Sequence, residues 1–178
     1  MKRIALINDV TGYSRCSIAA QLPIISAMGI ECVFVPTAIL SVNTMHPEYY
    51  FDDYTDRMND YIETYKKMKV SFDGIATGFL GSERQIDIVI DFIKTFKKKH
   101  TFVLVDPVMG DHGKLYPTYT TAMQDKMRQL IPYATIMTPN LTELCALLEV
   151  PYPHDIINRD EPVSYTHLRA HETELHLV

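Results

Sequence analysis

The sequence predicts an α/β fold built on a mostly parallel sheet. Short apolar, β-branched runs recur along the chain, and longer amphipathic stretches separate most of them. This alternation is typical of βαβ units, whose strands lie parallel. The composition, 47% hydrophobic and 22% charged over 178 residues, supports a folded core in one domain of ordinary size.

The apolar runs give the expected strands in chain order: Arg3–Ile7, Cys32–Val35, Gly74–Thr77, Phe102–Asp106 and Thr135–Thr138. Between the first two lies a helix that should end near Gly29, and Pro23 within it is expected to bend it or to shift its start.

Two later helices carry start signals. Ser82–Gln85 is a capping-box pattern that opens a helix over Ile86–Phe96, and Asn140–Glu143 is a similar pattern before Leu144–Leu148. Both helices follow expected strands, as βαβ units require.

Composition and charge exclude several classes of function. The net charge is −5 and Lys97–Lys99 is an isolated basic cluster, so the chain offers no broad basic face for nucleic acid or an anionic membrane. Cys16, Cys32 and Cys145 lie far apart without a C-x-x-C pair, which favours free thiols over a zinc site or disulfides. With no apolar run long enough for a signal peptide or a membrane span, we expect a cytoplasmic protein.

Small polar residues follow the expected strands, where ligands bind in open parallel sheets. Tight turns select the same residues, so each turn taken alone also has a structural explanation. The turns are Asn8–Gly12, Ser41–Thr44, Thr77–Phe79, Asp106–Asp111 and Thr138–Asn140.

Three acids in or after these turns, Asp106, Asp111 and Glu143, could hold Mg²⁺ together with substrate phosphates. Alternatively, Asp106 caps a turn, Asp111 is solvated and Glu143 completes a capping box. The chain has neither a G-x-x-x-x-G-K-[ST] loop nor a G-x-G-x-x-G fingerprint, so a phosphate donor would be held in another way.

The turn Asp106–Asp111, followed by Thr138–Glu143, resembles the paired D-P-V-x-x-D and T/V-P-N-x-x-E motifs of ribokinase-like vitamin kinases. With Ile7–Tyr13 and Thr77–Ser82 upstream, the ordered set is most similar to pyridoxal/pyridoxamine kinases, over residues 2–160. The resemblance implies a ribokinase-like three-layer fold, incomplete at the C-terminus of this chain.

The resemblance also implies an activity: transfer of the γ-phosphoryl group of ATP to the hydroxymethyl group of pyridoxal, pyridoxamine or pyridoxine. ATP and Mg²⁺ would be the cofactors, with a monovalent cation as a further candidate. Relatives of this fold suggest that the full-length protein is a homodimer.

The resemblance assigns substrate-binding positions. Asn8 and Asp9 stand where the family's substrate-facing Ser-His pair usually lies, which leaves the vitamer preference open. Thr44 matches a Thr near the pyridine ring, and Phe79 replaces a Tyr and could pack on that ring. The stretch Thr44–Tyr54 is expected to fold over the substrate or to be a surface loop packed by its own side chains.

The acidic positions follow in the same way. Asp106, Asn140 and Glu143 would lie at the ATP phosphates, and Asp106, Asp111 and Glu143 at the metal. The family's Gly-Thr-Gly-Asp segment, whose Asp is the catalytic base, does not occur in this sequence. We therefore assign no catalytic residue and expect this chain itself to be inactive.

Two domain ranges follow: 1–162, the N-terminal portion of a kinase domain, and 163–178, a non-native tail. The sequence Val163–Thr173 matches no part of the family pattern and resembles a translated sequencing adapter. A genuine histidine-containing C-terminal helix is the alternative.

Other functions stay open. A hydroxymethylpyrimidine kinase shares the fold and many motifs, and a sugar kinase is a further relative. A non-catalytic module that binds the vitamer is the alternative outside enzymes, and an unrelated nucleotide-binding domain would require the acids at the strand ends to be coincidental.

Overall fold

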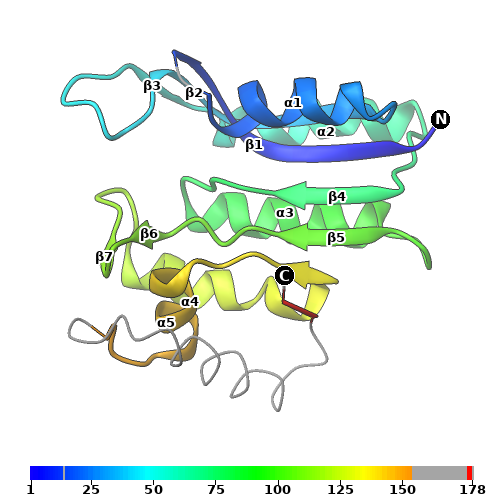
Figure 1. The fold of residues 1–178 in the computed structure, drawn as a ribbon. Helices are drawn as coiled ribbons and strands as arrows, with labels where there is room; N and C mark the ends of the chain where they lie inside the picture. Colours follow the sequence, from blue (N-terminus) through cyan, green and yellow to red (C-terminus); the bar gives the residue numbers. More distant parts are fainter. Residues whose placement is uncertain (14, 154–175, 178) are drawn as a thin grey trace.

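A seven-stranded sheet runs through the part of the chain that the computed structural model describes, residues 1–13, 15–153 and 176–177 (Figure 1). The strand order is β3-β2-β1-β4-β5-β8-β9. Neighbouring strands run parallel except for β3, which pairs antiparallel with β2 at one edge. The predicted α/β class with a mostly parallel sheet is confirmed.

The strands of this sheet are β1 (Arg3–Tyr13), β2 (Glu31–Val42), β3 (Phe51–Asp53), β4 (Gly74–Thr77), β5 (Phe102–Val105), β8 (Ile136–Met137) and β9 (His176–Leu177). A separate hairpin is formed by β6 (Gly110–Asp111) and β7 (Lys114–Leu115). The helices are α1 (Ser17–Ala27), α2 (Thr55–Lys67), α3 (Glu83–Phe96), α4 (Thr121–Arg128) and α5 (Leu141–Leu148), with a 3-10 turn at Ile131–Tyr133. Within the described residues, no helix has the length and apolar character needed to cross a membrane.

Helices α2, α3 and α4 lie side by side on one face of the sheet, and Figure 1 shows α3 behind β4 and β5. Their apolar side chains share one buried cluster with the strands, which includes Val35, Met58, Phe92 and Val105. Helix α1 packs on β1 and β2, and its buried Ile18 lies outside that cluster. Helix α1 lies in the crossover from β1 to β2, and α2 lies in the crossover from β2 to β4. The two crossovers run in opposite directions along the sheet, so right-handed connections place α1 on the face opposite to that of α2.

The predicted caps of α3 and α5 are present. Ser82 Oγ accepts a hydrogen bond from Gln85 N at 3.2 Å, and α3 begins at Glu83 rather than at Ile86. Asn140 and Glu143 form a complete capping box, with both reciprocal bonds at 2.9 Å. Each cap satisfies N–H groups that the first turn of a helix leaves without partners.

Strands β1 and β2 are longer than predicted. The expected end of β1 at Ile7 was wrong, because the strand continues to Tyr13 through the stretch interpreted as a turn, Asn8–Gly12. Strand β4 pairs with β1 from Ile4 to Ile7, and beyond this point β1 pairs with β2 alone. In Figure 1 these two strands and β3 form a ribbon that projects past the end of β4. Cross-strand pairing here overrides the local turn preference of Asn, Asp and Gly.

The expected non-native tail, residues 163–178, lies outside the described residues except for His176–Leu177. Those two residues form β9, which pairs with Ile136 and Met137 of β8. The boundary after residue 162 stays a prediction.

Candidate functional site

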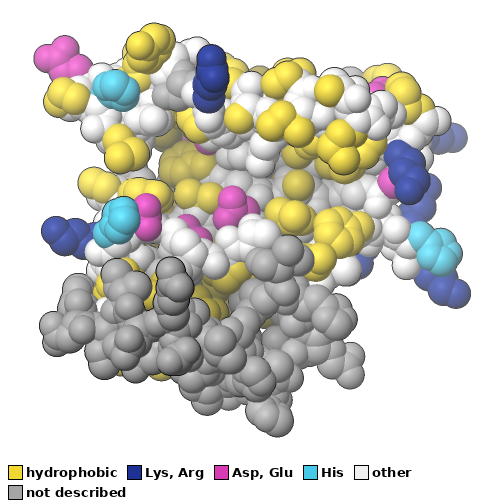
Figure 2. Space-filling model, viewed as in Figure 1, with side chains coloured by type: hydrophobic (Ala, Val, Ile, Leu, Met, Phe, Trp, Pro, Cys, Tyr) yellow, Lys and Arg dark blue, Asp and Glu magenta, His cyan; other side chains and the backbone are white. Residues whose placement is uncertain are grey.

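A cavity of about 290 Å³ lies where the extended ends of β1 and β2, which we call the β1–β2 ribbon, pass the carboxyl ends of β4 and β5. All four predicted substrate residues, Asn8, Asp9, Thr44 and Phe79, line it, and so does Asp106. Figure 2 shows acidic side chains beside the hollow on this face of the molecule. The fold thus brings together residues from β1 and from the segments that follow β2, β4 and β5.

Asn8 supports the site from behind. Its Oδ1 accepts hydrogen bonds from the backbone N–H groups of Phe79 at 2.9 Å and Asp9 at 3.0 Å, and its Nδ2 donates to Gln21 Oε1 at 3.3 Å. Both lone pairs of the amide oxygen are therefore used. Gly78 is needed beside it, because a Cβ there would lie 2.3 Å from Asn8 Nδ2. Asn8 thus fixes the β4–α3 turn against β1.

Asp9 lies at an irregularity in the sheet and is 5% exposed. The register between β1 and β2 shifts between Asn8, which is opposite Pro36, and Val10. Since proline has no N–H to give to the ladder, a bulge at this point is favoured. Thr11 Oγ1 donates a hydrogen bond to Asp9 Oδ2 at 2.5 Å. The bulge leaves a buried acid on the cavity wall.

Phe79 is held on both sides of its backbone. Its N–H bonds to Asn8, and its carbonyl accepts a hydrogen bond from Thr37 Oγ1 at 2.8 Å. The ring packs edge-on against Phe51 of β3, with centroids 6.3 Å apart and planes at 87°. A fixed aromatic ring gives the cavity a flat wall on which another planar ring can stack.

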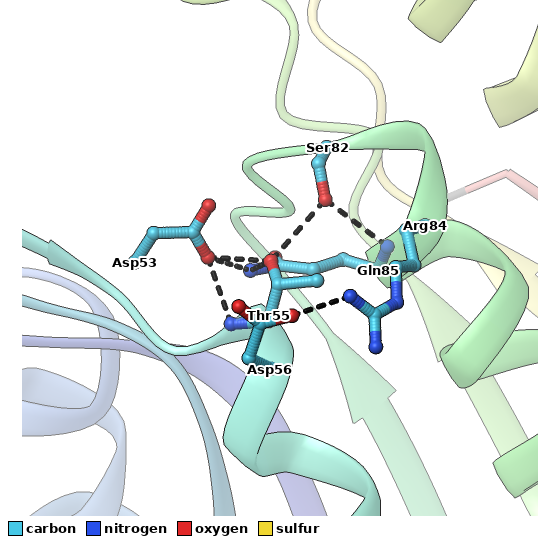
Figure 3. Close-up of polar contacts among 6 residues, drawn as sticks. All are labelled: Asp53, Thr55, Asp56, Ser82, Arg84 and Gln85. Atoms are coloured by element: carbon cyan, nitrogen blue, oxygen red, sulfur yellow. Dashed lines mark hydrogen bonds and ion pairs between the residues drawn. The ribbon is translucent and has the colours of Figure 1, made fainter.

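A polar network around the buried Gln85 side chain, which we call the Gln85 corner, supports this turn (Figure 3). The fully buried Gln85 side chain accepts a hydrogen bond from Gly81 N at 2.8 Å. Its Nε2 donates to Thr37 O and to Thr55 Oγ1, each at 2.8 Å. Thr55 Oγ1 in turn donates to Asp53 Oδ1. The members of the Gln85 corner are Thr37, Asp53, Thr55, Ser82 and Gln85.

The corner also corrects a detail of the predicted capping box at α3. Ser82 caps the helix as expected, but the Gln85 side chain bonds to Gly81 N and not to the N–H of Ser82. Gln85 therefore joins β2, β3 and α2 to the turn that carries Phe79, and all polar atoms of its side chain have partners.

The loop after β2 forms the rim of the cavity. Asn43 shapes it, since its Oδ1 accepts from Met45 N and its carbonyl from His46 N, both at 3.2 Å. Thr44 and Met45 line the cavity, although Met45 is 86% exposed. The stretch interpreted as a loop also contains β3, which pairs with β2. Closure of this loop over a substrate stays a prediction.

Asp106 follows β5 and lines the cavity. Burial raises the pKa of its carboxyl group to about 6, although a hydrogen bond with the Thr138 side chain acts in the opposite direction. Its backbone N–H donates to Thr77 O at 3.3 Å. Thr77 is itself buried, and its Oγ1 has no hydrogen-bond partner among the described residues. Buried polar groups here are incompletely satisfied.

Glu143 and Asn140 hold the turn that follows Asp106, from outside the cavity wall. Glu143 Oε1 accepts from Met109 N at 3.2 Å, and Asn140 Nδ2 donates to Gly110 O at 2.9 Å. Burial raises the pKa of Glu143 to about 7, and the charge of Asp106 adds to this, while the surrounding backbone N–H donors lower it. Glu143 therefore completes a capping box and is also electrostatically coupled to Asp106.

Asp111 lies on the β6–β7 hairpin and is more exposed than these two acids. Its side chain is 53% exposed, and it accepts from His112 N at 2.8 Å and pairs with the His112 ring at 3.5 Å. In the described part of the chain, no three His, Cys, Asp or Glu side chains are grouped closely enough to hold a metal ion. The structure thus brings Asp106 and Glu143 together but not the predicted trio.

The pair of Asp106 and Glu143 still fits Mg²⁺. This ion commonly takes one or two carboxylates and completes its shell with phosphate and water. Both acids have raised pKa values, and no Lys or Arg contributes to the pKa of either. A divalent cation would therefore supply the positive charge that no basic side chain supplies to this pair.

Tyr116 is a residue of the site that the sequence analysis missed. It lines the cavity, and burial, then the charges of Asp111, Glu143 and Asp106, raise the pKa of its phenol. Its position follows two strands of two residues each, which leave no periodic signal in a sequence. Further lining residues that were missed include Cys16, Ser17 and Gln21.

Comparison with known proteins identifies the family. The model of the phosphomethylpyrimidine kinase family matches residues 16–165. The chain belongs to this family. A candidate phosphomethylpyrimidine kinase from Bacteroides thetaiotaomicron is 44% identical and superimposes with a TM-score of 0.90, over 96% of this chain and 59% of that chain. Another crystal form of that protein, with a TM-score of 0.89, contains pyridoxal.

Pyridoxal kinases resemble the chain as well. The enzyme from Lactobacillus plantarum is 26% identical with a TM-score of 0.87, over 100% of this chain and 63% of that chain. A pyridoxine/pyridoxal/pyridoxamine kinase of Bordetella avium is 32% identical over 149 residues, which are 76% of this chain and 47% of that protein. The predicted ribokinase-like fold is confirmed, and the chain spans about half to two thirds of the length of these relatives.

Proposed function

We propose that this protein, at the full length of its relatives, transfers the γ-phosphoryl group of ATP to the hydroxymethyl group of a B6 vitamer: pyridoxal, pyridoxamine or pyridoxine. The observation that carries the proposal is the cavity, which joins a fixed aromatic wall at Phe79 to the acid Asp106. Its volume of about 290 Å³ suits a single small ring. A protein 44% identical to this chain has been crystallised with pyridoxal.

The four predicted substrate residues have distinct roles in this proposal. Phe79 stacks on the pyridine ring, and Thr44 contacts the ring from the rim. Asp9 faces the ring substituents, and Asn8 acts indirectly by holding Phe79. These roles place the substrate between the β1–β2 ribbon and the β4–α3 turn.

The acidic end of the cavity would serve the phosphates. When bound, Mg²⁺ would offset the charge on the transferring phosphoryl group, which is the main requirement of phosphoryl-transfer catalysis. Asp106 would hold the ion, with Glu143 behind it and Asn140 fixing the Gly110 turn. Asp111 is the weaker candidate because it lies half-exposed on the hairpin.

The direct test is a substrate panel with the full-length protein and ATP: pyridoxal, pyridoxamine, pyridoxine and hydroxymethylpyrimidine. We expect turnover on a B6 vitamer that collapses in Asp106→Asn. Asp91→Asn is the matched control, because Asp91 is on α3 with its side chain 78% exposed. Equal activity of Asp106→Asn and wild type would refute the proposed acidic site.

A second candidate is phosphorylation of hydroxymethylpyrimidine, which the family match favours. Turnover on the pyrimidine alone in the same panel would select this candidate. Binding of vitamers without any turnover would instead indicate a non-catalytic module.

We also propose a cytoplasmic location, supported by the free thiols of Cys16, Cys32 and Cys145. A homodimer and assistance by a monovalent cation follow from the resemblance alone. Size-exclusion chromatography and turnover in potassium against sodium buffers test these two points.

A further inference from the structure

Asp9 is a buried acid whose hydrogen-bonding capacity is mostly unused. It is 5% exposed and lines the cavity. Among the described residues, its side chain accepts one hydrogen bond, from Thr11 Oγ1 to Oδ2. A carboxylate offers about four acceptor sites. The remaining sites are available to a ligand in the cavity.

The charge of the cavity narrows the kind of ligand. Of the described residues that line it, Asp9 and Asp106 are acidic, and none is Lys, Arg or His. The proposed Mg²⁺ would offset the charge of Asp106, at the end of the cavity that would bind phosphates. Asp9 has no basic neighbour on the cavity wall. A buried carboxylate is costly unless a cation or several donors compensate it. A ligand that brings positive charge or N–H donors to Asp9 would therefore bind best.

The candidate substrates differ in the group on the ring carbon next to the reacting hydroxymethyl group. The vitamers share the ring and the reacting hydroxymethyl group, but on the adjacent ring carbon pyridoxal has an aldehyde and pyridoxamine an aminomethyl group. The aminomethyl group is an ammonium at neutral pH, and hydroxymethylpyrimidine has an amino group on the corresponding carbon. An aldehyde oxygen can only accept hydrogen bonds, so it cannot satisfy a carboxylate.

We propose that Asp9 is a specificity-determining residue. It selects substrates that have a nitrogen hydrogen-bond donor beside the reacting hydroxymethyl group, so that pyridoxamine is preferred to pyridoxal. The inference rests on the proposed phosphotransferase function. Two features of the structure fix the geometry of this contact. Thr11 orients the Asp9 carboxylate, and Phe79, held by Asn8 and Thr37, sets the plane of the ring.

The experiment compares kcat/KM for pyridoxamine and pyridoxal in the full-length wild type and in Asp9→Asn. We expect the wild type to favour pyridoxamine by about tenfold or more, and Asp9→Asn to lower this ratio by about tenfold to a hundredfold through KM for pyridoxamine. Asparagine keeps an acceptor for Thr11 and has nearly the same shape. Because the ratio is measured in one preparation, the fraction of active protein cancels.

The outcomes separate this inference from the proposed function. A wild type that prefers pyridoxal, or an unchanged ratio in Asp9→Asn, would overturn the role of Asp9 and leave the kinase activity intact. Equal losses for all vitamers would also overturn it, because they would point to a contact with the shared ring. If the wild type phosphorylates none of the substrates, the proposed function fails. The selectivity of Asp9 can then still be tested by measuring the affinities for pyridoxamine and pyridoxal from the absorbance of these ligands. If Asp9→Asn does not fold, the preference of the wild type decides.

Discussion

The Gln85 corner and the acid pair of Asp106 and Glu143 both bury polar side chains close to the cavity, but they differ in how those side chains are satisfied. In the corner, every polar atom of the Gln85 side chain has a partner. In the acid pair, both carboxyl groups have pKa values raised mainly by burial, and nearby Thr77 Oγ1 lacks a partner among the described residues.

This difference indicates that the Gln85 corner has a structural role and that the acid pair has a role in binding or catalysis. A satisfied buried network stabilises one arrangement of the chain, and here that arrangement fixes Phe79. A desolvated acid pair costs stability, and such groups are common where a protein binds ions or reacting groups. Loss of Gln85 should therefore mainly lower stability, whereas loss of the Asp106 carboxylate should mainly lower activity.

The largest expected effect on stability is that of Gln85→Leu. The substitution leaves Gly81 N without its acceptor and removes one of the two hydrogen bonds that the buried Thr37 carbonyl accepts, so we expect the free energy of unfolding to fall by about 3 kcal/mol. Urea unfolding measures it. Gln129→Leu, at the exposed C-cap of α4, is the matched control and should change little. A loss as small as that of the control would mean that the corner is not a scaffold.

The next effect concerns pH. The pKa of Glu143 is about 7 in the folded protein, against an ordinary value of 4.5, so the folded state binds the extra proton between these values. The resulting stability is fully present below pH 4.5 and is lost as the pH rises through 7. We expect the free energy of unfolding to fall by on the order of 3 kcal/mol across this window. Asp106 should act in the same direction.

Glu143→Gln should flatten this pH dependence. Its lost capping bond would lower stability by a constant amount at every pH, which separates the two effects. Glu63→Gln on α2, where the side chain is 48% exposed, is the control and should keep the slope. An unchanged slope in Glu143→Gln would contradict the raised pKa of Glu143 in the folded protein.

A smaller effect is expected from Mg²⁺ at pH 8, where both acids are ionised. A concentration ten times the dissociation constant should raise the free energy of unfolding by about 1.4 kcal/mol, seen as a higher Tm. The rise should disappear in Asp106→Asn and persist in Asp111→Asn. Loss of the response in Asp111→Asn would instead show that Asp111 is a ligand, as its motif suggests.

The smallest effect is expected at the edge of the Gln85 corner. Arg84 pairs with Asp56 there, and both side chains are more than half exposed, at 58% and 84% (Figure 3). Exposed ion pairs contribute little, so Arg84→Ala should cost less than about 0.5 kcal/mol by urea unfolding. A loss equal to that of Gln85→Leu would mean that surface charge, and not the buried amide, stabilises the corner.

Local patterns predicted the framework of the molecule well. Apolar runs located the parallel strands, Ser82 and Asn140 marked helix starts, and the rule that ligands bind at strand ends selected cavity residues such as Phe79 and Asp106. These features depend on residues close together in the chain or on topology alone.

The rest depended on contacts between distant residues. The extension of β1 beyond Ile7 requires pairing with β2, and Gln85 bonds to Thr37, which lies 48 residues away. Tyr116 reaches the cavity through a hairpin too short to show a pattern. Asp111 was grouped with Asp106 by its motif, but the short β6–β7 hairpin leaves its side chain half-exposed, and a role at the metal stays a prediction.

The most direct test of the account is to measure unfolding and turnover on the same preparations of full-length wild type and Asp106→Asn at pH 8. We predict that turnover falls by at least about a hundredfold while the free energy of unfolding stays the same or rises, because the substitution removes a desolvated charge. A variant that loses stability and retains turnover would contradict the assignment of Asp106 to the chemistry of this site.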